Sequence, residues 1–483
     1  MARSIKQNFI YSASYQILNI AVPLITTPIL SRTIGAQGNG IFSYTQSIAN
    51  YFVLFAQLGI TNYGVREIAK CGSDRYLRSH VFADLFAMNL FWGCLIVVAY
   101  LGYCFSFGFS YMPISLIWLC WVGGSVLDVT WLLNGCEEFK VPMIRNACTR
   151  LAGMMVIVLF VRTDADVWIY VFAIAVPFLL NALLIWPFVS SYVDFCAPSF
   201  NGAVSHLVPN FILFIPVVAV SLYTLLDKVM LGALGGMTQA GLYDYAEKIS
   251  KMPLAVVTAL GAVVLPRMTE ELASGRHTQA KSLVSTTMWF MECVSIALCF
   301  GIIAVAKEFT LFFFGKGYDE CALLMSILSI IIPLISATNV IGVQYLVPSG
   351  RDRQYTISVI FGAIVNITIN ILFIAKFGAV AAAIATVVAE LTVLALQIFM
   401  VRDELDFFDT FLSVIPFVVF GVAMFVVVRV VGVVLGGNVP SVFCITIEVL
   451  TGMAVYLFLS IGWCLVTRNK HFYRLFSKWF ILR

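Results

Sequence analysis

Charged residues are scarce in this sequence. They account for only 11% of its 483 residues, whereas soluble domains carry about 25%. The hydrophobic residue types reach 61%, and a water-soluble fold cannot bury that fraction because it needs a polar exterior. This composition excludes a soluble enzyme, a nucleic-acid-binding protein and a disordered chain. We therefore expect the chain to fold in a lipid bilayer.

Residues that usually bind metals are few or scattered. The four histidines share no ligand spacing, and the twelve cysteines contain no Cys-x-x-Cys pair. Half of the cysteines lie within apolar runs, where this residue behaves as a small hydrophobe. We expect no metal site and no cofactor. The net charge of +4 is too small to indicate a nucleic-acid partner.

The chain contains many apolar runs long enough to cross a membrane. A helix needs roughly 20 apolar residues to span the ~30 Å hydrocarbon layer. Polar clusters divide the sequence into fourteen such runs: 9–30, 39–61, 81–105, 111–133, 143–161, 167–188, 206–234, 240–265, 283–306, 321–346, 355–376, 378–400, 411–434 and 442–467. These runs predict an all-α polytopic membrane protein with about 14 transmembrane helices and no folded domain outside the membrane.

Lysine and arginine are distributed unevenly between the two sides of these spans. With the N-terminus inside, nineteen of them fall on cytoplasmic segments and five on outer segments. This asymmetry predicts that both termini are cytoplasmic. The first span lacks a small-residue cleavage site, so we expect it to remain as an uncleaved anchor.

A short string occurs twice. Residues 40–44 read GIFSY at the start of the second span, and residues 241–245 read GLYDY at the start of the eighth. Six spans separate the two copies, so the halves would cross the membrane with the same polarity. Duplicated bundles of this kind are typical of transporters, with the binding site at the interface between the halves. We predict a six-helix bundle over 1–200, a second over 201–403, and two further helices with a basic tail over 404–483.

Ionisable residues occur inside several predicted spans, where each costs at least ~2.5–3.5 kcal/mol unless it faces a cavity or a partner. At about 1.5 Å per helical residue, Asp227 and Lys228 lie level with Glu247 and Lys248 across one hairpin. The same argument offers plain ion pairs between Asp128 and Arg150, between Arg429 and Glu448, and between Glu247 and Lys251 one turn apart.

Two other carboxyl groups have no basic neighbour in their own hairpins. Glu292 and Glu390 lie near mid-depth, and a buried carboxyl group without a cation tends to bind a proton. They are therefore candidate proton carriers. Arg32 follows the first span and Arg66 follows the second. Both are either interface anchors or markers of the two mouths of the first bundle.

Four strings together resemble a known family: residues 59–69 (GITNYGVREIA), 131–140 (WLLNGCEEFK), 223–232 (YTLLDKVMLG) and 265–268 (LPRM). The sequence is similar, in order over its whole length, to the bacterial polysaccharide repeat-unit flippases of the O-antigen and capsule type. These form the polysaccharide-transport branch of the multidrug/oligosaccharidyl-lipid/polysaccharide exporter superfamily.

This resemblance implies two six-helix bundles plus two C-terminal helices in the bacterial cytoplasmic membrane. It also implies a substrate, a polyprenyl-pyrophosphate-linked oligosaccharide moved from the inner to the outer leaflet, and partners among other polysaccharide-assembly proteins. The positions that match the family's basic cavity are Arg32, Arg66, Arg150, Lys228 and Lys248. Proton or sodium coupling would use Asp227, Glu247, Glu292 or Glu390.

Three alternatives remain open from the sequence. An ion-coupled drug exporter of the same fold would favour acidic and aromatic cavity residues over basic ones. A lipid II flippase would use the same head-group chemistry with a different glycan. A membrane polysaccharide polymerase, ligase or glycosyltransferase would need catalytic residues on a sizeable outer loop, and the longest outer segment runs only from 307 to 320. We therefore expect a transporter and not an enzyme.

Overall fold

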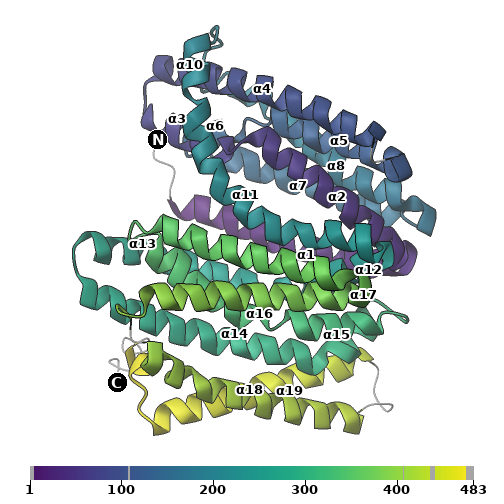
Figure 1. The fold of residues 1–483 in the computed structure, drawn as a ribbon, viewed down its shortest axis with the longest axis vertical. Coiled ribbons are helices and arrows are strands. Elements are labelled where there is room, and N and C mark those ends of the chain that lie inside the picture. The colour runs from purple at the N-terminus through teal and green to yellow at the C-terminus, as the bar shows by residue number, and fades with distance from the viewer. Residues whose placement is uncertain (1–4, 107–108, 406, 436–440, 475–483) are drawn as a thin grey trace. The chain divides into compact units, whose positions relative to one another are not determined.

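The computed structural model describes the backbone of residues 5–106, 109–405, 407–435 and 441–474, and every regular element within these ranges is a helix (Figure 1). The chain divides into two compact units, Met1–Gly241 and Leu242–Arg483. This division falls within one helix. The bundle boundaries at residues 200 and 403 stay a prediction.

The first unit contains these elements, of which η1 and η2 are 3-10 turns and η3 is π-helical: α1 (Ile5–Thr33), α2 (Gly35–Gln57), α3 (Ile60–Lys70), α4 (Arg75–Ser106), η1 (Phe109–Tyr111), α5 (Met112–Leu127), α6 (Thr130–Gly135), α7 (Lys140–Phe160), η2 (Asp164–Asp166), α8 (Val167–Leu184), α9 (Trp186–Val189), α10 (Phe200–Ser205), α11 (Leu207–Met230) and η3 (Leu231–Gly235). The helix α12 (Met237–Lys251) begins in this unit and continues into the second.

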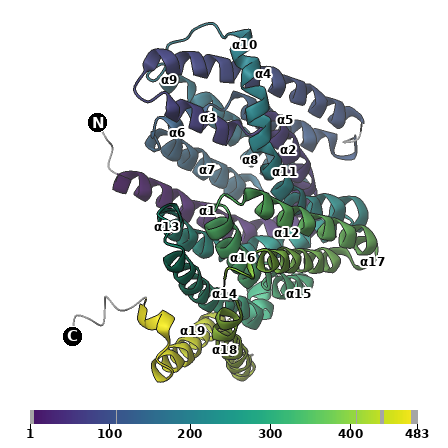
Figure 2. The same ribbon diagram turned by 60° about the vertical axis from the view of Figure 1, so that its left-hand side comes forward.

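The remaining elements of the second unit are α13 (Leu254–Ala273), α14 (His277–Phe313), α15 (Asp319–Leu328), α16 (Ile331–Thr338), the π-helical η4 (Asn339–Leu346), α17 (Asp352–Val401), α18 (Phe407–Leu435) and α19 (Ser441–Val466). Figure 2 shows α18 and α19 packed beside α14.

The helices agree with the predicted spans. Among the described residues, nine helical segments are long and apolar enough to cross a membrane, and the bent pair α12 and α13 would make a tenth. Each of the fourteen predicted spans overlaps at least one helix, so a count of fourteen is consistent with the structure. The predicted all-α polytopic fold is confirmed.

The core of the first unit is aromatic. The helices α5, α7 and α8 lie side by side (Figure 1), and α2 packs on α5. The Phe42 and Tyr170 rings stack with their centres 3.9 Å apart, and the indole nitrogen of the buried Trp118 donates to Thr45 Oγ1 at 3.0 Å. Large buried rings of this kind supply much of the packing energy of a helical bundle, and the buried indole N–H finds its acceptor.

Two predicted spans appear in the structure as one element, α17, which reverses at Gly378. This glycine has φ 54° and ψ −134°, a backbone conformation that favours a residue without a side chain. Gln397 Nε2 donates to Ser358 Oγ at 3.2 Å across the hairpin. A Cβ on Gly362 would approach the Ala389 carbonyl oxygen to 3.3 Å. The halves of α17 are therefore antiparallel neighbours, in agreement with the predicted division between 376 and 378.

The predicted span 321–346 is broken into α15, α16 and η4. The first break, at Ser329 and Ile330, lies just before Pro333. A proline ring clashes with the carbonyl group four residues earlier, here that of Ser329, so the helix cannot run straight through. The second interruption is the π-helical segment, which sequence periodicity does not reveal.

Candidate functional site

The helix α3 carries the predicted site residue Arg66 on its exposed face. The Arg66 guanidinium lies 5.2 Å from the centre of the Tyr63 ring, and its Nη2 is 3.2 Å from Glu67 Oε1. Lys70 Nζ contacts the same oxygen at 2.9 Å. The Tyr63 hydroxyl shares a 2.8 Å hydrogen bond with His206 Nδ1. The result is a polar cluster in which one carboxylate lies between two cations.

Two of the sequence strings that carry the resemblance hold this helix in place, because one forms most of α3 and the other forms most of α6. A Cβ on Gly64 would lie 2.6 Å from Cε3 of Trp131. A Cβ on Gly135 would lie 2.7 Å from Cβ of Ile68. Because the two helices approach this closely only through glycine, these contacts fix the position of α3 and of Arg66 upon it.

Arg150 is half-buried on α7, and its predicted pairing with Asp128 is wrong. Asp128 ends α5 in an extended conformation, and its Oδ1 accepts the backbone N–H of Thr130 at 3.0 Å as well as the Thr130 hydroxyl. The carboxylate therefore turns toward the start of α6. Thr130 Oγ1 in turn accepts from Arg145 at 3.0 Å. Within the described ranges, no ion pair involves Arg150.

The other predicted residues of the first unit lie near helix ends. Arg32 is exposed in the last turn of α1. In the last turns of α11, Asp227 is buried with 2% of its surface exposed, and Lys228 is half-buried. The Asp227 carboxylate acts electrostatically on the phenol of Tyr51 in α2. These two helices therefore share a charged and polar contact.

Four charged residues of α12 form two ion pairs at i,i+4 spacing. Lys251 Nζ lies 2.6 Å from Glu247 Oε1, so the predicted pair is confirmed. Lys248 Nζ lies 2.6 Å from Asp244 Oδ2, and the Asp244 side chain is completely buried. Asp244 was not among the predicted site residues, although its position one turn before Lys248 is a sequence signal for this pair.

Lys251 also has a second acidic neighbour. Glu390 of α17 has 5% of its surface exposed, and it interacts electrostatically with Lys251 and with Tyr355. The sequence offered no basic neighbour for Glu390 within its own hairpin. In the structure the basic neighbour of Glu390 is Lys251, which comes from α12. Lys251 therefore interacts with two carboxyl groups, those of Glu247 and Glu390.

Glu292 is buried in α14 and has few polar neighbours. Its Oε2 accepts a long hydrogen bond of 3.5 Å from Ser295 Oγ, and its Oε1 has no hydrogen-bond partner in the part of the chain that the structure describes. No described lysine or arginine forms an ion pair with it. The position agrees with the sequence-based expectation of a carboxyl group without a basic neighbour.

The predicted pair between Arg429 and Glu448 is wrong. Arg429 Nη1 contacts both carboxylate oxygens of Glu308 at 3.0 and 2.9 Å and also donates to the Ala304 carbonyl oxygen at 3.3 Å. Glu448 lies buried on α19, next to Cys444, and faces a cavity of about 490 Å³ lined by apolar residues of α14, α18 and α19. The neighbouring helix α14, and not the hairpin partner, supplies the counter-charge.

The remaining expectations concern binding. The substrate-binding role of Arg32, Arg66, Arg150, Lys228 and Lys248, and the coupling role of Asp227, Glu247, Glu292 and Glu390, stay predictions. Among the residues that the structure describes, no group of three or more histidine, cysteine, aspartate or glutamate side chains has the arrangement to hold a metal ion.

Comparison with known proteins decides the family. The family model described as "Polysaccharide biosynthesis protein" matches residues 5–272, which is more than half of the chain. The chain belongs to this family. The chain is also 24% identical over 409 residues to the "Putative O-antigen transporter" of Escherichia coli (strain K12), covering 83% of this chain and 97% of that protein. The family predicted from the four strings is confirmed.

Solved structures of other proteins share the fold of this chain. Its fold matches that of the lipid II flippase MurJ in an inward closed conformation, with a TM-score of 0.73, 14% identity, and coverage of 96% of this chain and 100% of that one. An inward-facing multidrug resistance transporter of the MATE family in the MOP superfamily matches with a TM-score of 0.63 and 11% identity, over 81% of this chain and 95% of its own. The protein is a multi-pass membrane protein that shares the fold of these two structures.

Proposed function

We propose that this protein is a flippase that moves polyprenyl-pyrophosphate-linked oligosaccharides from the inner to the outer leaflet of the bacterial cytoplasmic membrane. It would act by alternating access and serve surface polysaccharide biosynthesis. The observation that carries this proposal is the similarity to the Escherichia coli relative over 83% of this chain and 97% of that protein. The named relatives are transporters and flippases, so the proposal is transport without a chemical reaction.

The chemistry of such a substrate requires basic groups at membrane depth. A glycan and a pyrophosphate cannot cross hydrocarbon unaided, because each unsatisfied polar group costs several kcal/mol there. Arginine and lysine donate charge-assisted hydrogen bonds to phosphate oxygens. We assign this role to Arg32, Arg66, Arg150, Lys228 and Lys248. Half-buried Arg150 forms no ion pair among the described residues, so its guanidinium can donate to a phosphate.

Ion coupling is the second part of the proposal. Protons or sodium ions would bind at Asp227, Glu247, Glu292 or Glu390. Burial of all four carboxyl groups supports this role, since a carboxyl group out of contact with bulk water can exchange an ion only when the transporter opens. Both termini would lie in the cytoplasm, and other polysaccharide-assembly proteins would receive the translocated lipid.

Removal of the protein tests the direction of transport. We expect lipid-linked oligosaccharide to accumulate in the inner leaflet, where a membrane-impermeant sugar-modifying reagent cannot reach it. Accumulation of unpolymerised units in the outer leaflet would identify a polymerase, and accumulation of lipid II would identify the other glycan lipid as substrate. Unchanged glycan lipids together with increased drug sensitivity would identify a drug exporter. Each of these three results would overturn the proposal.

The pair of Lys248 with Asp244 allows a sharper test of the cavity role. Lys248→Gln alone removes the ion pair of the completely buried Asp244 carboxylate, so loss of function could reflect loss of folded protein. The double variant Asp244→Asn with Lys248→Gln removes both charges and should restore the protein level. We expect surface polysaccharide to stay low in the double variant. Full recovery of polysaccharide would show that Lys248 is purely structural.

A further inference from the structure

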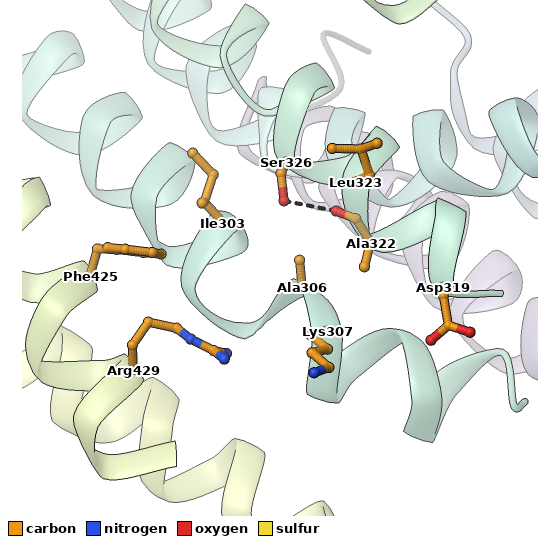
Figure 3. A pocket seen from close by; sticks show the side chains of 9 residues that line it. All are labelled: Ile303, Ala306, Lys307, Asp319, Ala322, Leu323, Ser326, Phe425 and Arg429. Atoms are coloured by element: carbon orange, nitrogen blue, oxygen red, sulfur yellow. Dashed lines mark hydrogen bonds between the residues drawn. The ribbon is translucent and has the colours of Figure 1, made fainter. Parts of the chain in front are cut away.

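A second cavity of about 370 Å³ lies between α14, α15 and α18, outside all the residues assigned to transport. Its charged lining comes from three helices, with Lys307 on α14, Asp319 on α15 and Arg429 on α18. Its walls are apolar and include Phe425 and Leu323. Figure 3 shows the nitrogen ends of Arg429 and Lys307 pointing toward each other, with Asp319 on the far side of Lys307. The cavity therefore has a charged side and an apolar side.

The charged groups of this cavity have unused hydrogen-bonding capacity. Arg429 uses Nη1 for Glu308 and the Ala304 carbonyl group, which leaves Nε and Nη2 without a contact in the described part of the chain. Lys307 and Asp319 are exposed, and no ion pair or hydrogen bond of their side chains is found within the described ranges. Two cations that point toward one another repel unless an anion lies between them.

The cavity lies where α14 and the start of α15 change from apolar to charged residues. Lys307 and Glu308 are the first charges after the apolar run 283–306, Asp319 begins α15, and Arg429 stands near the end of α18. Such a change marks the boundary between hydrocarbon and water, which is the depth of lipid headgroups. The occupant should therefore be part of a membrane lipid.

Charge balance decides which headgroup fits. Lys307 and Arg429 carry two positive charges, whereas Asp319 and the Glu308 paired with Arg429 carry two negative charges, so the site is neutral overall. A multiply charged pyrophosphate would meet the Asp319 carboxylate with no excess positive charge to compensate. A headgroup with one phosphate and one ammonium group matches both signs. A primary ammonium can also donate hydrogen bonds to a carboxylate, which a quaternary ammonium cannot do.

We propose that this cavity binds the headgroup of an aminophospholipid, with the phosphate between Lys307 and Arg429 and the ammonium group on Asp319. The glycerol and the first carbons of the acyl chains would lie over Phe425 and Leu323. This site is separate from the transport residues, and the inference does not rest on the proposed function.

Native mass spectrometry of the full-length protein tests the proposal, with phosphatidylethanolamine, phosphatidylcholine and phosphatidylglycerol of identical acyl chains as probes. We expect phosphatidylethanolamine to bind about tenfold more tightly than phosphatidylcholine, which is the size of one charge-assisted hydrogen bond. In Asp319→Asn, the affinities for phosphatidylethanolamine and phosphatidylcholine should differ by no more than about twofold. Lys307→Gln should weaken all three lipids, because each carries the phosphate.

Two exposed residues outside the cavity provide matched controls. Lys316→Gln removes a lysine from the connection between α14 and α15, and Asp164→Asn removes a carboxylate from the first unit. Both should leave the lipid preference of the unmodified protein intact. Equal binding of phosphatidylethanolamine and phosphatidylcholine would overturn the proposal, as would a preference that survives Asp319→Asn. Tighter binding of phosphatidylglycerol, lost in Lys307→Gln, would reveal a plain anion site and would also refute it.

Discussion

Gly40 and Gly241, the first residues of the two copies of the repeated string, pack against each other backbone to backbone. A Cβ on Gly40 would overlap the Met237 carbonyl oxygen and lie 3.1 Å from the Gly241 nitrogen. A Cβ on Gly241 would overlap the Ala36 carbonyl oxygen and lie 2.8 Å from the Gly40 nitrogen. Asn39 Nδ2 donates to the Gly241 carbonyl oxygen at 3.1 Å. The repeat therefore marks a helix crossing that has no room for side chains.

Alanine at either glycine should destabilise the protein. The obstructing atoms belong to the backbone and cannot rotate away. We therefore expect Gly40→Ala and Gly241→Ala each to lower the free energy of unfolding by about 1–3 kcal/mol through overpacking. Thermal unfolding of the purified protein, followed together with its level in membranes, measures the effect. Gly123→Ala is the matched control, because a Cβ there meets no atom within 4 Å. Equal melting temperatures for all three variants would contradict the crossing.

The sequence was sufficient to predict the helices because the bilayer imposes a simple rule on length and polarity. Every predicted span overlaps a helix, and even the tight reversal at Gly378 agrees with the predicted division. The repeat also had a physical basis, since its two glycines touch. Breaks inside a span were harder to predict. The one before Pro333 has a sequence signal, whereas the π-helical turn of η4 has none.

The partners of charged side chains could not be predicted from the sequence in the same way. The distance of a residue from a helix end gives its depth, but it gives neither the direction of its side chain nor the identity of the next helix. Arg429 and Glu448 lie at similar predicted depth, yet Arg429 turns to Glu308 of α14. Lys251 was recognised only as the partner of Glu247, because its electrostatic interaction with Glu390 joins residues far apart in the sequence.

A double-mutant cycle should confirm the partner of Arg429. The side chains of Arg429 and Glu308 are 32% and 26% exposed, so the pair is half-buried and water screens it in part. We expect a coupling energy of about 1–2 kcal/mol between Arg429→Met and Glu308→Gln in thermal unfolding. The parallel cycle with Glu448→Gln is the control and should give less than about 0.5 kcal/mol. A larger coupling to Glu448 would restore the pair predicted from the sequence.

The cluster on α3 should make stability depend on pH. Burial opposes ionisation of Glu67, but the hydrogen bonds and charges of Lys70 and Arg66 outweigh it and hold the pKa of this carboxyl group below its ordinary value. A carboxyl group with a lowered pKa stabilises the fold above its unfolded pKa, and this contribution is lost as the pH falls through the folded value. Glu67→Gln should therefore lower the melting temperature at pH 7.

At a pH below the lowered pKa of Glu67, the unmodified protein and the Glu67→Gln variant should approach the same melting temperature, since protonation removes what the substitution removes. Glu137→Gln is the control, because Glu137 is exposed and forms no ion pair among the described residues. Its melting temperature should match that of the unmodified protein at both pH values. A difference for Glu67→Gln that grows toward acid pH would mean that the carboxylate is not stabilising.

Lys251 should be important for both stability and transport, because it interacts with two buried carboxyl groups. Replacing it with methionine removes this cation from the neighbourhood of Glu247 and Glu390, and we expect a loss of about 1–3 kcal/mol in stability together with lower transport. Lys281→Met, at an exposed position of α14, is the matched control and should change neither property.

A triple variant distinguishes a structural role of the charges of Lys251, Glu247 and Glu390 from a role in transport. Lys251→Met with Glu247→Gln and Glu390→Gln removes the cation together with both carboxylates that interact with it, so the melting temperature should recover. Transport should stay low if the charges serve the substrate or a coupling ion, because the restored fold then lacks the groups that bind it. Lys251→Arg, which keeps the positive charge, should retain part of the activity. Recovery of both stability and transport in the triple variant would show that Lys251 acts only as a structural counter-charge.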